Sequence, residues 1–556
     1  MTSGSTSGTS GSPTSGPTGG PTGDPAPDGP GAPTGADGRL NGAQALIRTL
    51  AACGVDTCFS NPGTSEMHFV AALDTVPEMR GVLALFEGVA TGAADGYARM
   101  AGKPAATLLH LGPGLGNGLA NLHNARKGKV PVVNVVGDHA TYHKQYDAQL
   151  ESDIETVARN VSPWIRWSTT PRDVGRDAAE AVAAALGPPG AVATLILPAD
   201  VSWSPGGEVA APVPARGPQP VDADVVEGAA KALRSGEPAA LLLGGTALRE
   251  RGLVAASRAA NAVGARLLAE TFPTRHERGA GLPDVSRLAY LAEFAAGQLE
   301  GLRHLVLVDA KAPVSFFAYP GKPSYLVPEG CTVHVLATAD QDAPGALEAL
   351  ADLLGAPADG ADRHDAERPE LPTGELTPQA VAQAVGALLP EGAIVSDEAN
   401  TSGLFTPGLT AGAPRHDWLC LTGGAIGQGL PVATGAAVAC PDRKVLALQA
   451  DGSALYTIQA LWTQAREGLD VTTVVYNNRS YAVLNMELSR VGAEAGPRAR
   501  DLLDLSRPDI DFVAVARGLG VPATRATTAD ELADQLGRAL AEPGPALIEA
   551  VVPSLM

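Results

Sequence analysis

The sequence lacks several features that would place it in common protein classes. It has no apolar run long enough to cross a membrane, so we expect no membrane-spanning segment. Its 40 Lys and Arg are outnumbered by 60 Asp and Glu, and the formal net charge is -20. This balance argues against a nucleic-acid partner, because neutralising phosphates requires basic side chains. Five cysteines among 556 residues show no paired metal-binding spacing, which favours reduced thiols in a cytoplasmic protein.

The composition divides the chain into a tail and three larger regions. Residues 1–38 are almost all Ser, Thr, Gly, Pro, Ala and Asp, without the basic start and apolar centre of a secretory signal. Such a stretch cannot bury enough surface to offset its ordering entropy, so we expect a disordered N-terminal tail. Beyond it, strand-like runs alternate with helical patterns, which is typical of α/β folds with parallel sheets. Linkers rich in proline then predict three doubly wound α/β domains, at residues 39–205, 222–356 and 373–556.

The segment from Ala450 to Tyr481 carries the most specific chemical pattern. Asp451 follows the strand-like run "KVLALQA", a helix is predicted over 453–466, and the strand "VTTVVY" leads to Asn477 and Asn478. Parallel sheets bind ligands at the carboxyl ends of their strands, where adjacent strands would bring Asp451 and Asn478 side by side. A helix N-terminus favours an anion, and carboxylate, amide and carbonyl oxygens suit a hard divalent cation. We therefore expect a metal–diphosphate site rather than an ordinary helix cap followed by an asparagine turn.

This pattern resembles the GDG…NN signature of the thiamin-diphosphate-dependent 2-oxo acid decarboxylase and acetolactate synthase superfamily, with Ala450 in place of the first glycine. The resemblance extends from Asn41 to Met556. It implies a pyrimidine-binding, a central and a diphosphate-binding domain, in that order. It also implies that thiamin diphosphate and Mg²⁺ are the cofactors, with the cation bound by the Asp451 and Asn478 side chains and the Ser480 carbonyl.

Other segments carry the family's cofactor residues by the same resemblance. "LFEGVATGAADGYAR" places the activating glutamate at Glu87, which must hold a proton in a low-dielectric pocket and hydrogen-bond to the aminopyrimidine ring. "LTGGAIGQGLP" places the carbonyl that receives the 4′-amine at Gly424 and an aliphatic wedge at Ile426. The expected diphosphate contacts are Asn400 and Thr401 in "SDEANTS", with Gly452, Ser453 and Tyr456.

Further motifs resemble benzoylformate decarboxylase in particular. "NPGTSE" places Thr64 where that enzyme has a serine, and "LLHLGPGLGNG" and "FPTRHERG" place catalytic histidines at His110 and His276. Two imidazoles fit a reaction in which the enamine left by decarboxylation is protonated and an alkoxide later loses its proton. His139 and His143 are alternatives near the same strand ends. The glycine spacing in "GPGLGNG" does not fit a dinucleotide loop, and we interpret it as a tight active-site turn.

Some positions depart from that enzyme. Cys420 and Glu487 stand where it has phenylalanines, and Val483 replaces a smaller residue. A carboxylate in a phenyl pocket would be costly, which argues against an unmodified aryl substrate. Glu487 would then meet a polar or cationic substrate group, or face solvent.

The chain also resembles proteins labelled acetolactate synthase large-subunit-like, but it has no convincing FAD-contact pattern, so FAD is not expected. The expected activity is decarboxylation of a small 2-oxo acid through a C2 adduct and enamine, with or without carboligation. Acetolactate synthesis and a catalytically silent cofactor-binding paralogue remain the alternatives. The resemblance further implies a homodimer or homotetramer with active sites between subunits, so that Glu87 and Asp451 of one site come from different chains.

Overall fold

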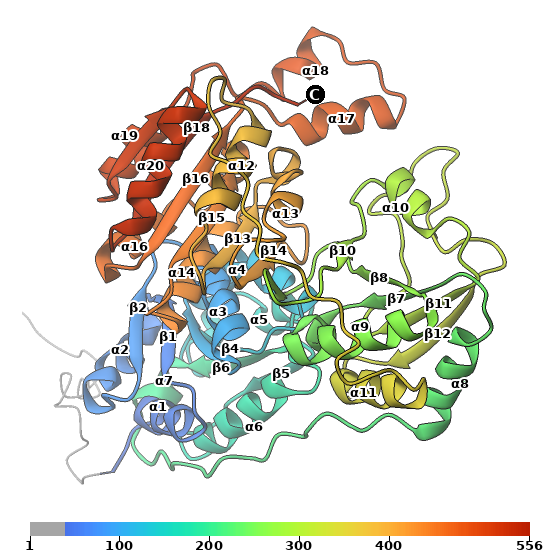
Figure 1. Ribbon diagram of the computed structural model, residues 1–556. Coiled ribbons are helices and arrows are strands. Elements are labelled where there is room, and N and C mark those ends of the chain that lie inside the picture. The colour runs from blue at the N-terminus through green and yellow to red at the C-terminus, as the bar shows by residue number, and fades with distance from the viewer. Residues whose placement is uncertain (1–38, 556) are drawn as a thin grey trace, which may run out of the picture.

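The computed structural model describes residues 39–555, and the expected disordered tail, residues 1–38, lies outside the described residues. Three parallel-sheet α/β units follow one another along the chain, and Figure 1 shows them in blue to teal, green to yellow, and orange to red. The predicted fold class is thereby confirmed. Within the described residues no helix is both long and apolar enough to span a membrane.

The first unit is a six-stranded parallel sheet with helices on both faces. The strand order is β2-β1-β3-β4-β6-β5, from β1 (Thr57–Asn61), β2 (Arg80–Leu83), β3 (Ala105–Leu109), β4 (Val132–Asp138), β5 (Trp164–Trp167) and β6 (Val192–Pro198). Its helices are α1 (Gly42–Ala52), α2 (Met67–Ala72), α3 (Glu87–Ala101), α4 (Leu111–Lys127), α5 (Ile154–Ala158), α6 (Val174–Leu186) and α7 (Ala199–Trp203). Asn41 caps α1, since its Oδ1 accepts the Gln44 N–H at 2.8 Å.

One prediction for this unit is wrong. The glycine-rich stretch "GPGLGNG" is not a tight turn but the beginning of helix α4. Gly114 and Gly118 lie on sides of α4 that approach Glu87 and Thr91, so the small residues serve close packing of two helices.

The middle unit is a five-stranded parallel sheet. The strand order is β10-β8-β7-β11-β12, from β7 (Ala239–Leu243), β8 (Arg266–Ala269), β10 (Ser286–Arg287), β11 (His304–Val308) and β12 (Thr332–Ala337). Its helices are α8 (Ala223–Leu233), α9 (Glu250–Val263), α10 (Ala292–Leu299) and α11 (Ala343–Leu353). Between β8 and β10 the chain leaves this sheet, because β9 (His276–Arg278) pairs antiparallel with strand β14 (His416–Cys420) of the third unit.

The third unit is a seven-stranded sheet with β9 at one edge. The strand order is β17-β18-β16-β15-β13-β14-β9, from β13 (Ile394–Glu398), β14, β15 (Val445–Ala450), β16 (Val471–Asn477), β17 (Ala523–Ala526) and β18 (Ala546–Val551). Its helices are α12 (Pro378–Leu388), α13 (Thr406–Leu409), α14 (Gly429–Ala439), α15 (Asp451–Ala454), α16 (Ala460–Glu467), α17 (Ala482–Arg490), α18 (Pro497–Asp501), α19 (Phe512–Gly518) and α20 (Ala529–Ala541). The helix predicted over 453–466 is therefore wrong in its continuity, because a turn separates α15 from α16.

Helices α3 and α14 join the first and third units, and their residues share one hydrophobic core. Their backbones approach so closely that a methyl group at Gly96 would lie 2.1 Å from the Val432 carbonyl oxygen. A methyl group at Gly435 would lie 1.8 Å from the Ala93 carbonyl oxygen. The small residues of α3 and α14 thus permit a helix contact that larger side chains would prevent.

A buried ion pair joins all three units at the same place. Arg99 binds Asp95 through Nε at 2.7 Å and Nη2 at 2.8 Å, and both side chains are fully buried. The guanidinium also donates to the carbonyl oxygens of Thr274 at 3.1 Å and Cys420 at 2.8 Å, and to Thr422 Oγ1 at 3.1 Å. These bonds fix the middle and third units against helix α3.

Candidate functional site

The ends of strands β15 and β16 lie together, as the sequence predicted. The two strands pair in parallel, and Asp451 begins α15 directly after β15. Its Oδ2 accepts the backbone N–H groups of Asn478 at 3.0 Å and Arg479 at 2.7 Å. Burial raises the pKa of the Asp451 carboxyl, although these N–H donors favour its ionised form. The carboxylate is thus held at the carboxyl edge of the sheet.

The neighbouring loops converge on the same edge. Asn478 Oδ1 accepts the Ser480 N–H at 3.0 Å, and its Nδ2 donates to Ser402 Oγ at 3.4 Å. Ser402 belongs to the 3₁₀ turn η5 (Asn400–Gly403), which contains the predicted diphosphate residues Asn400 and Thr401. Loop 478–480 and turn η5 therefore lie side by side.

The alanine in the GDG-like motif causes no backbone strain. Ala450 has φ -74° and ψ 147°, an extended conformation that any residue adopts. The next two motif residues are buried: a methyl group at Gly452 would lie 2.4 Å from Tyr481 Cε1, and Ser453 Oγ accepts from Gln449 Nε2 at 2.8 Å. Glycine is thus required by space at position 452 and not by conformation at position 450.

Loop 423–427 packs against the turn that follows α15. Gly424 has φ +76° and Gly427 has φ +94°, so both positions favour glycine. Thr457 Oγ1 donates to the Gly427 carbonyl at 2.9 Å, and a methyl group at Gly427 would lie 2.6 Å from Tyr456 Cβ. Tyr456 thus lies against this loop, with 53% of its surface exposed, and Ile426 is half-buried.

Glu398 holds loop 423–427 in place, although it is not among the site residues predicted from the sequence. Its Oε1 accepts the Gly427 N–H at 2.6 Å, and its Oε2 accepts the Gly429 N–H at 2.6 Å and Gln449 Nε2 at 3.0 Å. Burial raises the pKa of Glu398 to about 7, against the opposing effect of these donors. Its position at the end of β13 was the available signal, since that is where parallel sheets place functional side chains.

Glu87 begins helix α3 and is 9% exposed. Its Oε2 accepts Asn117 Nδ2 at 3.0 Å from helix α4. The side-chain amide of Asn121, also on α4, donates to the carbonyl oxygens of Gly88 at 2.7 Å and Gly427 at 3.3 Å. The start of α3 and loop 423–427 are therefore adjacent within one chain, whereas the sharing of sites between subunits stays a prediction.

His110 has a carboxylate partner that was not predicted from the sequence. It lies between β3 and α4, and its Nδ1 lies 2.8 Å from Glu66 Oε2 and 3.3 Å from Ser65 Oγ. Glu66 is 2% exposed, while the His110 side chain is 23% exposed. Thr64, in contrast, is exposed, and its side chain makes no hydrogen bond within the described chain. In "NPGTSE" the side chains within hydrogen-bond distance of His110 are thus those of the serine and the glutamate, and not that of Thr64.

His276 does not join His110 in an open site. It lies in β9 opposite Trp418 and is 1% exposed, and neither ring nitrogen has a hydrogen-bond partner in the described chain. Burial and then Arg278 lower the pKa of His276 well below its usual range. The sharing of one site by two histidines stays a prediction. The alternatives His139 and His143 pack against each other after β4, with ring centroids 5.3 Å apart.

Cys420 and Glu487, which stand where benzoylformate decarboxylase has phenylalanines, both contact other side chains of the protein. Cys420 is buried, and Arg287 Nη1 lies 3.0 Å from its Sγ. Glu487 on α17 accepts the Tyr319 hydroxyl at 2.7 Å and the Tyr290 hydroxyl at 3.3 Å. Glu487 therefore contacts the middle unit and does not face solvent.

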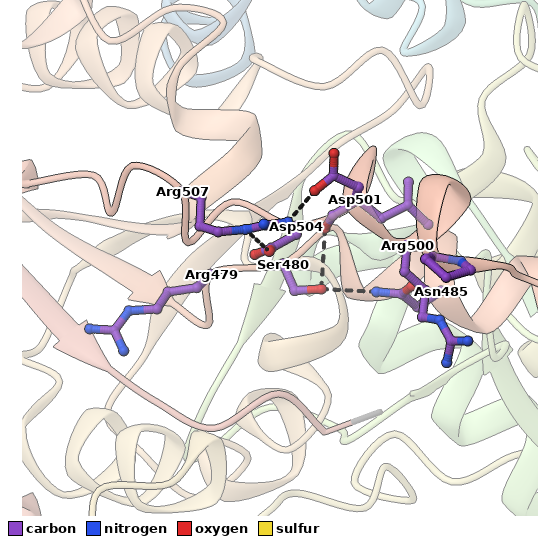
Figure 2. Close-up of a pocket in the computed structure, with 9 residues that line it drawn as sticks. Arg479, Ser480, Asn485, Arg500, Asp501, Asp504 and Arg507 are labelled. Atoms are coloured by element: carbon purple, nitrogen blue, oxygen red, sulfur yellow. Dashed lines mark hydrogen bonds and ion pairs between the residues drawn. The ribbon is translucent and has the colours of Figure 1, made fainter.

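An open cavity of about 580 Å³ lies beside Ser480 (Figure 2). Three arginines line it, but Arg507 is paired with Asp504 at 3.0 Å and with Asp501, and Arg479 pairs with Asp509 at 2.9 Å. Because two of its three cations are neutralised within the protein, the cavity is a poor cradle for a diphosphate.

Comparisons with known proteins agree with this arrangement. Residues 40–158 match the N-terminal TPP binding domain of thiamine pyrophosphate enzymes, and residues 405–550 match their C-terminal TPP binding domain. The chain belongs to the thiamine pyrophosphate enzyme family, and as a member of it this protein is a lyase- or transferase-type thiamin diphosphate enzyme.

Two relatives and one solved structure cover almost the whole chain. A Mycobacterium tuberculosis protein with the provisional name acetolactate synthase large subunit IlvX is 65% identical over 520 residues, covering 93% of this chain and 100% of its own. Benzoylformate decarboxylase of Pseudomonas aeruginosa is 32% identical, covering 89% and 96%. The structure of the thiamine diphosphate-dependent 4-hydroxybenzoylformate decarboxylase of Rhodococcus jostii RHA1 superposes with a TM-score of 0.81 at 26% identity, covering 92% and 99%.

Proposed function

We propose that the protein decarboxylates a 2-oxo acid with thiamin diphosphate and Mg²⁺. The observation that carries the proposal is the buried Asp451 carboxylate, held at the β15–β16 edge beside Asn478. One carboxylate with amide and carbonyl oxygens suits a Mg²⁺ ion that completes its coordination with phosphate and water. The relatives named as decarboxylases and acetolactate synthases support the same chemistry.

The residues present fit these cofactors. Asp451, Asn478 and the Ser480 carbonyl would hold the cation, and the diphosphate would lie against η5 and the start of α15. The residues assigned to this diphosphate contact are Asn400, Thr401, Gly452, Ser453 and Tyr456. Loop 423–427 has a left-handed backbone at Gly424, whose carbonyl would receive the 4′-amine, and Ile426 would be the aliphatic wedge.

The cofactor, when bound, supplies a nucleophilic carbon that attacks the 2-oxo group and accepts the electron pair left by CO₂. Glu87 would hold a proton at its carboxyl against the aminopyrimidine ring, where Asn117 orients it at 3.0 Å. His110 would move a proton to or from the reacting carbon or oxygen, with its ring oriented by Glu66 at 2.8 Å. We assign this transfer to His110 alone, because His276 is buried.

A carboligase is the second candidate, since the 65% identical relative carries an acetolactate synthase name. The two activities differ in whether a proton or a second carbonyl compound captures the reacting carbon. We further propose a cytoplasmic homodimer or homotetramer with shared sites. All five cysteines are free thiols in the structure, which fits a reducing compartment.

The test begins with binding and then measures chemistry. Calorimetric titration with thiamin diphosphate should show Mg²⁺-dependent binding that Asp451→Ala abolishes and that Asp509→Ala, an exposed acidic control, leaves unchanged. A panel of 2-oxo acids is then assayed for CO₂ and for products. Aldehyde with CO₂ identifies a decarboxylase, and a hydroxyketone identifies a carboligase. Bound cofactor without CO₂ release from any acid would contradict the proposal and favour a silent paralogue.

A further inference from the structure

Four aromatic side chains of the middle unit form a cluster that the proposed chemistry does not yet use. This aromatic cluster consists of Phe272, Tyr290, Phe316 and Phe317. The Phe316 ring centroid lies 5.8 Å from that of Phe272, 5.2 Å from that of Tyr290 and 4.9 Å from that of Phe317. These are the tilted and edge-on separations of favourable aromatic pairs. The cluster is thus a preformed surface and not a set of isolated rings.

The cluster touches the proposed cofactor loop. A methyl group built at Gly424 would lie 2.7 Å from Phe316 Cζ, so this ring lies directly against the glycine assigned to the 4′-amine. Phe316 and Phe317 nevertheless remain 43% and 53% exposed. Rings that are ordered by their neighbours but remain open beside a reaction centre can bind an apolar ligand group.

The polar side chains around the cluster contact one another within the protein. Glu487 accepts both the Tyr290 and the Tyr319 hydroxyls, as described above. The Arg490 guanidinium lies over the Tyr319 ring at 4.5 Å and pairs with Glu293 at 3.0 Å. The cost of a carboxylate in an apolar pocket therefore does not arise, because Glu487 is turned toward these hydroxyls.

We propose that the aromatic cluster binds the side group of the 2-oxo acid, and that this group is bulky, flat and apolar rather than a methyl group. The inference rests on the proposed function, because it takes loop 423–427 as the cofactor wall. Because the aromatic cluster lies next to loop 423–427, the apolar side group would contact the carbon atoms of its rings. The 2-oxo acid end of the same molecule would then reach the cofactor. An apolar pocket discriminates by about 10- to 200-fold between two ligands that differ by one methylene group.

The test uses 2-hydroxy acids, which have no 2-oxo group and so bind without being decarboxylated. Protein loaded with thiamin diphosphate and Mg²⁺ is titrated calorimetrically with lactate and with phenyllactate. We expect phenyllactate to bind at least about tenfold more tightly than lactate. Phe316→Ala should weaken phenyllactate about tenfold and leave lactate unchanged, and Phe317→Ala should act in the same direction. Phe294→Ala, at a 66% exposed phenylalanine without ring contacts in the described chain, is the matched control.

The outcomes separate this inference from the proposed function. Failure of thiamin diphosphate to bind would overturn both. Bound cofactor with equal affinities for the two acids, or with equal losses of both in Phe316→Ala, would overturn the inference alone. Sedimentation of each variant tests whether the cluster instead contacts a second copy of this chain. A variant that loses self-association while its affinities for both hydroxy acids stay unchanged would assign the cluster to a subunit contact. That result would overturn the inference.

Discussion

Arg99→Ala should destabilise the protein far more than the loss of an ordinary ion pair. The substitution removes two bonds to Asp95 and three bonds to the middle and third units. It leaves the fully buried Asp95 carboxylate with the Gln428 amide as its remaining side-chain donor in the described chain. A buried charge without its partner is costly, because neither water nor a counterion can replace the lost interaction.

The magnitude follows from this geometry. Breaking one side of a buried ion pair costs about 3–5 kcal/mol, and the lost contacts to Thr274, Cys420 and Thr422 place Arg99 toward the upper end. The matched control is Arg159→Ala, whose partner Glu155 lies at 2.8 Å but with both side chains more than half exposed. Exposed pairs of this kind contribute about 0–1 kcal/mol.

Urea unfolding of both variants, followed by circular dichroism, measures the difference. We also expect Asp95→Ala combined with Arg99→Ala to cost less than the sum of the single changes, since the double variant leaves no unpaired charge. An Arg99→Ala cost equal to that of Arg159→Ala would refute the reasoning. Additive single changes would show that the two charges do not interact.

Two further predictions concern the site. Because burial raises the pKa of Glu398 to about 7, the contribution of Glu398 to stability is fully present below its ordinary value of about 4.5 and is lost as the pH rises through about 7. Glu398→Gln should reduce this loss of thermal stability between pH 5 and pH 8, measured by thermal unfolding. Burial also raises the pKa of Glu270 to about 7, but Glu270 is present in both proteins and contributes equally to each. An unchanged pH dependence would contradict the raised pKa of Glu398. Glu87→Gln and Asp451→Ala should each be inactive alone, but mixed dimers of the two should recover about half of the activity if sites are shared, since one of two sites then keeps both residues. No recovery in purified mixed dimers would place both residues of a site in one chain.

The sequence determined where Asp451 and Asn478 meet. Alternating strand and helix patterns imply parallel strands, and the ends of adjacent parallel strands meet at one edge. Asp451 and Asn478 follow such strands, so their proximity could be predicted without coordinates, and the structure confirms it. The start of α3 at Glu87 and the cap at Asn41 depend on residues close in sequence.

The predictions that failed rest on patterns with two interpretations. Glycines in "GPGLGNG" suit a turn, but they also suit a helix that packs closely on another, and the contact with α3 decides between them. Likewise, the run after Asp451 has helical spacing, yet Thr457 bonds to Gly427 in the turn between α15 and α16. Local propensity could not reveal either neighbour.

Only the tertiary structure decided which side chains meet across the site. Glu66 is 44 residues from His110, Glu398 is 29 residues from Gly427, and Asn121 is 306 residues from the same loop. It also placed His276 in a buried strand of another unit's sheet and turned Glu487 toward two tyrosines. The sequence by itself determined the class of chemistry and the edge of the sheet, because motifs and strand ends are local. The partners that orient these side chains and shift their pKa values are brought together by the packing of the three sheets. Local sequence patterns do not predict that packing.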